Sequence, residues 1–255
     1  MSHFDAAADK LELQKILHRI QLYASSDLGK EAAESIEPIS DLETISKEHN
    51  RVSEMKRVLE GEGSFPIDGI KDIRPALQQS TIENNILSPR DLLNISSTFQ
   101  TGRNIKLFIE KRREYLMQLI ELSSSISIFK EIEFNISQAI DDNAQVKDTA
   151  SKELRSIRQS IVDKQNSIRR ALEKILRATA EQGKVRDEIV TTRDGRMVIP
   201  IKSELKNRFP GFIHSASSSG QTVFIEPSET LTLNNEITEL FFKEQREVER
   251  ILRQL

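Results

Sequence analysis

The chain of 255 residues lacks cysteine and tryptophan, and it contains only 9 glycines and 7 prolines. Without cysteine it can form no disulfide, no thiolate zinc site and no cysteine nucleophile. Its four histidines are too few and too scattered to predict a histidine-based metal site. The shortage of glycine and proline argues against sandwiches, barrels and Rossmann-type folds, which need many tight turns. Instead, 37% hydrophobic and 30% charged residues are typical of long helices flanked by solvent.

Positive and negative charges nearly balance, with 37 Lys and Arg against 40 Asp and Glu and a formal net charge of −3. This balance excludes a uniformly basic nucleic-acid-binding chain, although it leaves room for a local basic surface. No run of the sequence approaches the roughly 20 apolar residues of a membrane-spanning helix. The first residues lack the basic and apolar regions of a signal peptide. We therefore expect a cytoplasmic protein with no membrane partner.

Helical periodicity dominates the first two thirds of the chain. It predicts two helices within residues 1–60, a loop-rich connector, and a third helix from Ser88-Pro89 to about Leu122. Residues 145–182 contain no glycine or proline, which predicts a helix about 57 Å long. Its apolar residues alternate by three and four like a coiled-coil seam, with Lys164 at one seam position. The expected seam residues are Leu154, Ile157, Ile161, Ile168, Ala171 and Ile175.

The period changes from 3.6 to 2 after Gly183. Strands are expected over 188–193 and 196–202, flanking the Asp194-Gly195 hairpin signal, and over 211–214 and 221–225. A second long helix then begins near Glu226-Pro227, and its apolar pattern is still running at Leu255. We therefore expect two long helices that pair antiparallel with a β module inserted between them, in a chain that is a fragment of a larger protein.

Two stretches of the sequence carry a specific resemblance. Residues 192–240 contain a DGR hairpin, VIP-x-K, R-x-PG, H-x-x-S-x-S-G-x-T-x-F-I-EP and L-N-N-E, and residues 69–77 read GIKDIRPAL. Together with Leu87-Ser88-Pro89 and Asp91-Leu92-Leu93, this pattern resembles the second bacterial MutS family, the MutS-like proteins with a C-terminal Smr nuclease domain. The resemblance covers essentially the whole chain.

The resemblance implies a mainly α fold: a helical core with two long antiparallel lever helices that carry a small antiparallel β clamp module at their tip. The implied boundaries are a helical core over 1–144, one lever helix over 145–187, the clamp over 188–226 and a truncated second lever helix over 227–255. The chain contains no G-x-x-x-x-G-K-[ST] phosphate-binding loop. ATP, Mg²⁺ and nuclease activity are therefore expected in absent parts of the parent, an ATPase and Smr-type endonuclease, and this segment is not expected to be an enzyme.

The candidate functional sites are cationic. Residues 151–186 carry ten Lys or Arg against four acids, and residues 193–208 add five against two. Unpaired cations of this kind bind phosphate backbones, whereas the alternative is that they solvate a long helix or pair with the acidic second helix. The predicted nucleic-acid contacts are Arg193, Arg196, Lys202, Lys206, Arg208, His214, Ser217, Ser218, Ser219 and Gln221.

Other features of the sequence have structural interpretations. His214 beside serines lacks a positioned acid and an oxyanion-hole motif, so we expect no catalytic residue. Glu226 is expected to mark a helix start rather than a carboxylate site, and Phe212 to fill the small β core. Aromatic residues make up only 5% of the chain, which argues against a base-stacking platform.

The leading hypothesis is that the segment is the core and clamp of a dimeric MutS-like ATPase. The implied partners are branched or duplex DNA, as in recombination suppression, or collided ribosomes, with a homodimer as the parent assembly. In this hypothesis the long helices transmit ATPase-driven motion to the clamp. The alternative is a structural or dimerisation module whose clamp docks on a protein partner.

Overall fold

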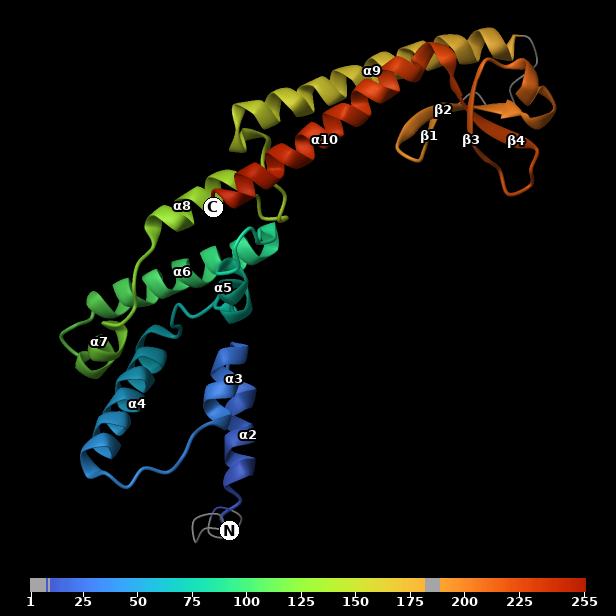
Figure 1. Cartoon of the computed structure of the whole chain (residues 1–255). Helices are drawn as coiled ribbons and strands as arrows, with labels where there is room; N and C mark the ends of the chain where they lie inside the picture. Colours follow the sequence, from blue (N-terminus) through green and yellow to red (C-terminus); the bar gives the residue numbers. More distant parts are fainter. Residues whose placement is uncertain (1–7, 9, 182–188) are drawn as a thin grey trace. The chain divides into compact units, whose positions relative to one another are not determined.

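The computed structural model describes residue 8, residues 10–181 and residues 189–255. The chain divides into two compact units, residues 1–147 with 252–255 and residues 148–251 (Figure 1). The first unit is helical, whereas the second combines two long helices with a four-stranded antiparallel sheet. The prediction of a mainly α fold with a small antiparallel β module is confirmed.

The first unit contains seven labelled helices in its described part. They are α2 (Leu13–Tyr23), α3 (Asp27–Glu34), α4 (Leu42–Glu62), α5 (Arg74–Ser80), α6 (Pro89–Glu110), α7 (Met117–Ser123) and α8 (Lys130–Ala139). Side chains of Ser26, Asp41 and Ser88 cap α3, α4 and α6 by accepting main-chain N–H bonds. Such caps satisfy amides that have no partner within the helix, so they define where each helix begins.

Helix α6 ends earlier than its apolar pattern predicts. It ends at Glu110 rather than near Leu122, and α7 follows after a turn. The Glu54 carboxylate of α4, only 8% exposed, accepts the main-chain N–H groups of Gln118 and Leu119 at about 3.0 Å. A buried carboxylate at these first-turn amides favours a new helix start, and this contact spans more than 60 residues of sequence. The short helices α3 and α5 were also missed by the sequence pattern.

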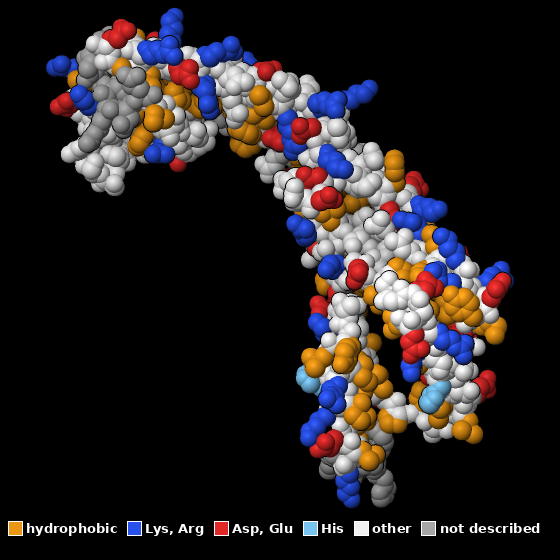
Figure 2. Space-filling view, turned by 180° about the vertical axis from the view of Figure 1, so that it is seen from behind, with side chains coloured by type: hydrophobic (Ala, Val, Ile, Leu, Met, Phe, Trp, Pro, Cys, Tyr) orange, Lys and Arg blue, Asp and Glu red, His pale blue; other side chains and the backbone are white. Residues whose placement is uncertain are grey.

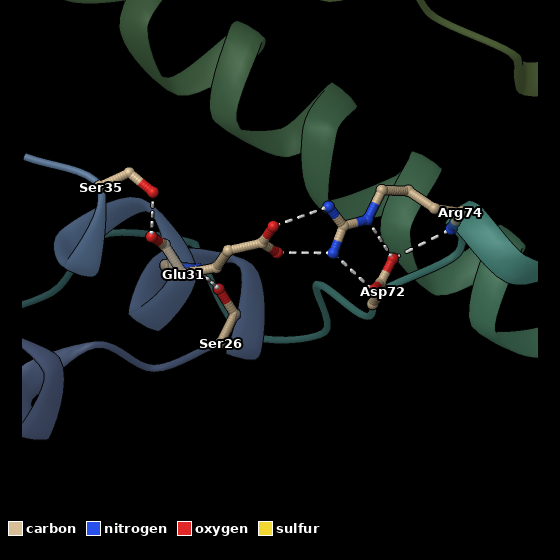
Figure 3. Close-up of polar contacts among 6 residues, drawn as sticks. Ser26, Glu31, Ser35, Asp72 and Arg74 are labelled. Atoms are coloured by element: carbon tan, nitrogen blue, oxygen red, sulfur yellow. Dashed lines mark hydrogen bonds and ion pairs between the residues drawn. The ribbon is translucent and has the colours of Figure 1, made fainter.

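An ion-pair cluster ties α3 to the start of α5 (Figure 3). The Arg74 guanidinium donates to both carboxylate oxygens of Glu31, at 3.2 and 2.6 Å, and also to Asp72. Hydrogen bonds from Arg74 hold the pKa values of Glu31 and Asp72 below their ordinary range. Because these side chains are largely exposed, solvent screens the attraction and the cluster adds orientation more than stability.

Two long helices form the stem of the second unit. Helix α9 (Lys152–Ala180) and helix α10 (Leu231–Arg253) run antiparallel, because Arg158 pairs with Glu244 while Lys164 pairs with Glu236. Helix α9 begins seven residues later than residue 145, which corrects the predicted start. Val146 instead forms an isolated antiparallel bridge with Ile140, and residues Asp148–Ala150 form a 3-10 turn. Residues 182–187 of the predicted helix lie outside the described residues.

The apolar seam of α9 follows the prediction over its first half only. Leu154, Ile157, Ile161 and Ile168 are buried as expected. Beyond them the buried face consists of Leu172, Leu176 and Thr179, whereas Ala171 and Ile175 are half-buried. A helix with 3.6 residues per turn drifts away from a 3.5-residue repeat, and here the sheet rather than α10 alone determines which side is covered.

The sheet has the strand order β1-β2-β4-β3. Its strands are β1 (Thr191–Arg193), β2 (Arg196–Lys202), β3 (Gly211–Ala216) and β4 (Thr222–Pro227), and 3-10 turns follow β2 (Ser203–Arg208) and β4 (Ser228–Thr230). Asp194 and Gly195 adopt positive φ values of 49° and 76°, which confirms the predicted hairpin turn. One face of the sheet packs on the long helices through a shared core that includes Ile168, Leu172, Leu176, Ile199, Ile201, Val223, Ile225 and Ile237.

Phe212 lies outside this core, and its predicted place there is wrong. It sits on β3, the edge strand, with 60% of its surface exposed. Phe212 is in register with Glu226, while its neighbour Ile213 is in register with the core residue Ile225. Because alternate residues of a strand face opposite sides of the sheet, Phe212 lies on the side that faces away from the core. Phe209, which precedes the strand, packs against the core instead.

Candidate nucleic-acid interface

The outer face of the sheet, opposite the core, carries the first candidate cation. Arg193 and Arg196 are register partners across the β1–β2 hairpin, and this pairing places them on the same face. The Arg193 guanidinium lies over the Phe224 ring, 4.1 Å from its centroid. Stacking on an aromatic ring holds a guanidinium in place while leaving its charge available to a ligand. Arg193 is exposed and thus suited to contact phosphate.

The 3-10 turn after β2 presents two further candidates. Lys206 and Arg208 are exposed, whereas Leu205 and Phe209 on either side pack against the core of the sheet. Alternation of this kind anchors the turn by its apolar side chains and directs the charged ones to solvent. The turn therefore presents both cations to solvent.

A shallow hollow marks the end of the sheet where β2 stops and β4 starts. It has a volume of about 440 Å³ and is lined by Lys202, Ser203, Glu204, Gly220 and Gln221. The Ser203 hydroxyl donates to the Gly220 carbonyl at 2.6 Å, and the Ser203 amide donates to the Gln221 carbonyl at 3.1 Å. These bonds join the two sides of the hollow.

The serine-rich turn beside this hollow is an ordered hairpin turn. The Gly220 amide donates to the Ser217 carbonyl at 2.8 Å, and Gly220 has a φ of +68°, which glycine adopts at little cost. The Ser217 hydroxyl accepts from the Thr222 amide at 3.2 Å, so Ser217 supports the turn. Ser218 and Ser219 are exposed at its end. These two hydroxyls are the ones placed to meet a ligand.

Arg196 and His214 are turned toward a buried carboxylate. Glu226 of β4 is 1% exposed, and its Oε1 accepts from Arg196 Nη1 at 2.7 Å while its Oε2 lies 2.6 Å from His214 Nε2. Arg196 Nη2 also donates to Asn235 Oδ1 of α10 at 2.7 Å. We call these four residues the Glu226 cluster. The expectation that Glu226 only marks a helix start is wrong, because α10 begins at Leu231 and Glu226 lies within the sheet.

The predicted site residues therefore lie in four different places. Arg193 is on the outer face, Lys206 and Arg208 are on the turn after β2, and Lys202, Gln221 and the serines surround the hollow. Arg196 and His214 belong to the Glu226 cluster. Glu226, Asn234 and Asn235 were missed as site residues, although the E-P and L-N-N-E motifs that contain them were recognised.

The basic side chains of α9 divide into two groups. Arg158 and Lys164 face α10, where they pair with Glu244 and Glu236. These two cations therefore follow the alternative interpretation, in which basic residues of α9 pair with the acidic second helix. Arg169, Lys174 and Arg177 are exposed and form no ion pair with any residue that the structure describes. Figure 2 shows Lys and Arg side chains spread along the upper edge of this helix pair. Lys184 and Arg186 lie outside the described residues.

The described residues contain no group of three or more His, Asp or Glu side chains that could hold a metal ion. Within the same residues, no helix is long and apolar enough to cross a membrane. The exposed polar groups of the module include the cations Arg193, Lys206 and Arg208 and the hydroxyls of Ser218 and Ser219. Such groups bind anions through charge and hydrogen bonds.

The structure defines a mainly helical protein in which two long antiparallel helices end in a small β module. No family model matches the chain. Curated relatives do match, and each is named endonuclease MutS2: that of Alkaliphilus oremlandii (strain OhILAs) is 37% identical over 247 residues, 96% of this chain and 31% of that protein. Those of Symbiobacterium thermophilum and Geobacillus sp. (strain WCH70) are also 37% identical, over 245 and 248 residues, and 96% of this chain matches 30% and 32% of their lengths.

The chain is thus homologous, over nearly its whole length, to one segment of the MutS2 family, and it belongs to that family. It spans about a third of the length of the curated relatives it matches. The resemblance to this family is confirmed, and the structure gives the DGR, E-P and L-N-N-E motifs of this chain physical roles. They supply Arg196, Glu226 and Asn235, three of the four residues of the Glu226 cluster.

Proposed function

We propose that this segment is the part of a MutS2 protein that engages nucleic acid, and that its β module contacts the phosphate backbone. The observation that carries the proposal is the exposure of three cations on one small module, Arg193 on β1 and Lys206 and Arg208 on the turn after β2. Each cation of this kind that neutralises a phosphate releases counterions and strengthens binding at low salt. Lys202 and the Ser218-Ser219 hydroxyls would add contacts at the hollow.

The long helices would carry this module as levers. The exposed cations of α9, Arg169, Lys174 and Arg177, extend the positive surface away from the sheet. Branched or duplex DNA and ribosomal RNA present the same phosphate chemistry, so the proposal concerns the backbone and not a base sequence. ATP and Mg²⁺ would bind outside these 255 residues, in the remaining two thirds of a MutS2 protein, and a homodimer would place two modules on one ligand.

Charge reversal tests the proposal. A variant with Arg193, Lys202, Lys206 and Arg208 all changed to Glu is compared with the unchanged chain by fluorescence anisotropy, using a four-way DNA junction, a DNA duplex and an RNA hairpin. A matched control changes four exposed cations of the first unit to Glu, which alters the net charge equally: Lys56, Arg57, Arg90 and Lys130. Binding is measured between low and moderate salt.

We expect the module variant to lose binding and the control to retain most of it. The slope of log Kobs against log salt should fall by about one for each phosphate contact that a single reversal removes. Equal losses in the two variants would mean that only net charge matters, and unchanged binding by the module variant would contradict the proposal directly.

A further inference from the structure

The Glu226 cluster connects three strands to the helix that follows them. Arg196 comes from β2, His214 from β3, Glu226 from β4 and Asn235 from near the start of α10. The Arg196 guanidinium bridges the two halves, because one nitrogen donates to Glu226 and another to Asn235, each at 2.7 Å. A planar guanidinium donates in fixed directions, so this double contact fixes an angle as well as a distance.

A second polar contact reinforces the same connection. The side-chain amide of Asn234, 3% exposed, donates to the Met197 carbonyl and accepts from the Met197 amide, both at 3.3 Å. One side chain thus satisfies both main-chain groups of a β2 residue, as a neighbouring strand would. Asn234 and Asn235 together attach α10 to two successive residues of β2.

The covalent connection between the sheet and α10 is also short. Strand β4 ends at Pro227, the 3-10 turn spans Ser228–Thr230, and α10 begins at Leu231. The Thr230 hydroxyl, in a residue that is fully buried, donates to the Pro227 carbonyl at 3.0 Å. By comparison, α9 contributes the apolar side chains of Ile168, Leu172 and Leu176 to the shared core. Apolar contacts are not directional, whereas hydrogen bonds are.

We infer that the Glu226 cluster with Asn234 is the joint that fixes the orientation of the β module on α10. Arg196 and His214 are then positioning residues that aim the exposed cations of the module, rather than ligands of phosphate. The joint makes the module and α10 a single body, so any rotation of α10 would be transmitted to the sheet. This inference goes beyond the proposed function, since it concerns the protein without nucleic acid.

The absence of cysteine makes the joint accessible to spin labelling without a background to remove. One labelled pair, Ala216→Cys on β3 and Lys243→Cys on α10, reports the orientation of the module on that helix. A second pair, Glu173→Cys on α9 and Lys243→Cys, spans about 20 Å along the helix axes and reports only the helix pair. Pulsed electron–electron double resonance (DEER) gives the distance distribution between the two labels of each pair in the full 255-residue chain.

We expect a narrow distribution for the first pair in the parent chain, and a broad or shifted one after Arg196→Gln or Asn235→Ala. Asn235→Asp keeps an oxygen acceptor for Arg196 and should restore the narrow distribution. Arg193→Gln, in the same hairpin but outside the cluster, should leave it unchanged. The helix-pair distribution should be the same in all variants, because the joint lies outside it.

Two results would overturn the inference. A first-pair distribution unaffected by both Arg196→Gln and Asn235→Ala would show that these contacts do not set the orientation. Broadening of the helix-pair distribution in the same variants would show a general loss of structure instead of a loosened joint. Asn235 is exposed, so its substitution tests the joint even where Arg196→Gln fails to fold.

A second readout separates positioning from phosphate contact, and it alone rests on the proposed function. If Arg196 only positions the module, Arg196→Gln lowers affinity for a DNA junction without changing the salt slope. A slope that falls by about one would assign Arg196 to the phosphate backbone and contradict the inference. Spin-label results that support the joint stand even where the chain binds no nucleic acid.

Discussion

Glu247 is a buried carboxylate of the second unit, and its protonation should lower the stability of that unit. Its side chain, 5% exposed, lies on α10 and accepts from Arg250 at 2.7 Å and from the Ser151 hydroxyl at 2.6 Å. Ser151 is the N-cap of α9, so the carboxylate also lies at the positive end of that helix. Hydrogen bonding to Arg250 is the main cause that lowers the pKa of Glu247 from 4.5 to about 2.

This lowered pKa determines how the stability of the folded state depends on pH. A carboxyl group that binds its proton more weakly in the folded state stabilises folding above its unfolded pKa, here 4.5, and loses this contribution as the pH falls toward about 2. The full shift corresponds to about 3 kcal/mol. Because Arg250 is 48% exposed, solvent screening reduces this to about 1–2 kcal/mol.

The test replaces Glu247 with Gln, which keeps the shape and removes the charge. Hydrogen exchange of the α9 amides, followed by mass spectrometry and corrected for the intrinsic exchange rate, measures the local free energy at pH 7, 5 and 3.5. We expect the variant to lose about 1–2 kcal/mol at pH 7 and progressively less as the pH falls. Glu249→Gln, at an exposed position of the same helix, is the matched control and should change little.

A difference between Glu247→Gln and the parent that stays constant from pH 7 to 3.5 would refute the reasoning. It would mean that the variant acts through packing and not through charge. No difference at pH 7 would mean that the cost of burying the carboxylate cancels its pairing, a balance known for buried ion pairs.

Two further predictions concern packing and backbone geometry. Ile168 of α9 is fully buried against the sheet, so Ile168→Ala should destabilise the second unit by about 2–5 kcal/mol. The loss is measured as reduced hydrogen-exchange protection of the α9 amides. Val162→Ala, at a position of the same helix that is 49% exposed, should cost far less. At Gly211 a Cβ would lie 2.3 Å from the Glu226 carbonyl oxygen, so Gly211→Ala should lower the midpoint temperature of thermal unfolding. Gly61 in α4 has open space around its Cβ position, so Gly61→Ala should raise this midpoint slightly. An unchanged midpoint in Gly211→Ala would show that β3 shifts freely against β4.

Local signals in the sequence predicted the elements that depend on neighbouring residues. The Asp194-Gly195 turn and the Ser88-Pro89 helix start appear in the structure as expected. Each involves contacts within about four residues, so the pattern contains the physical cause. The pattern also predicted the antiparallel arrangement of the long helices, because it placed the β module between them.

Features that depend on distant residues could not be predicted in the same way. Helix α7 begins where the carboxylate of Glu54, more than 60 residues earlier in the sequence, binds its first amides. The candidate site shows the same limit. The sequence predicted Arg196 and Arg208 as equivalent cations, yet one is held by Glu226 and the other is exposed.

The sequence by itself determined the class of structure: few glycines and prolines, no cysteine and much charge made long helices with one small β insertion the expected outcome. Only the tertiary structure decided which charged groups remain available to a ligand. Glu226 is buried, and a buried carboxylate needs hydrogen-bond partners. Arg196 and His214 supply these contacts, so Glu226 holds them within the cluster. Lys206 and Arg208 are neighbours of Leu205 and Phe209, which pack against the core of the sheet, and the charges of Lys206 and Arg208 remain in solvent.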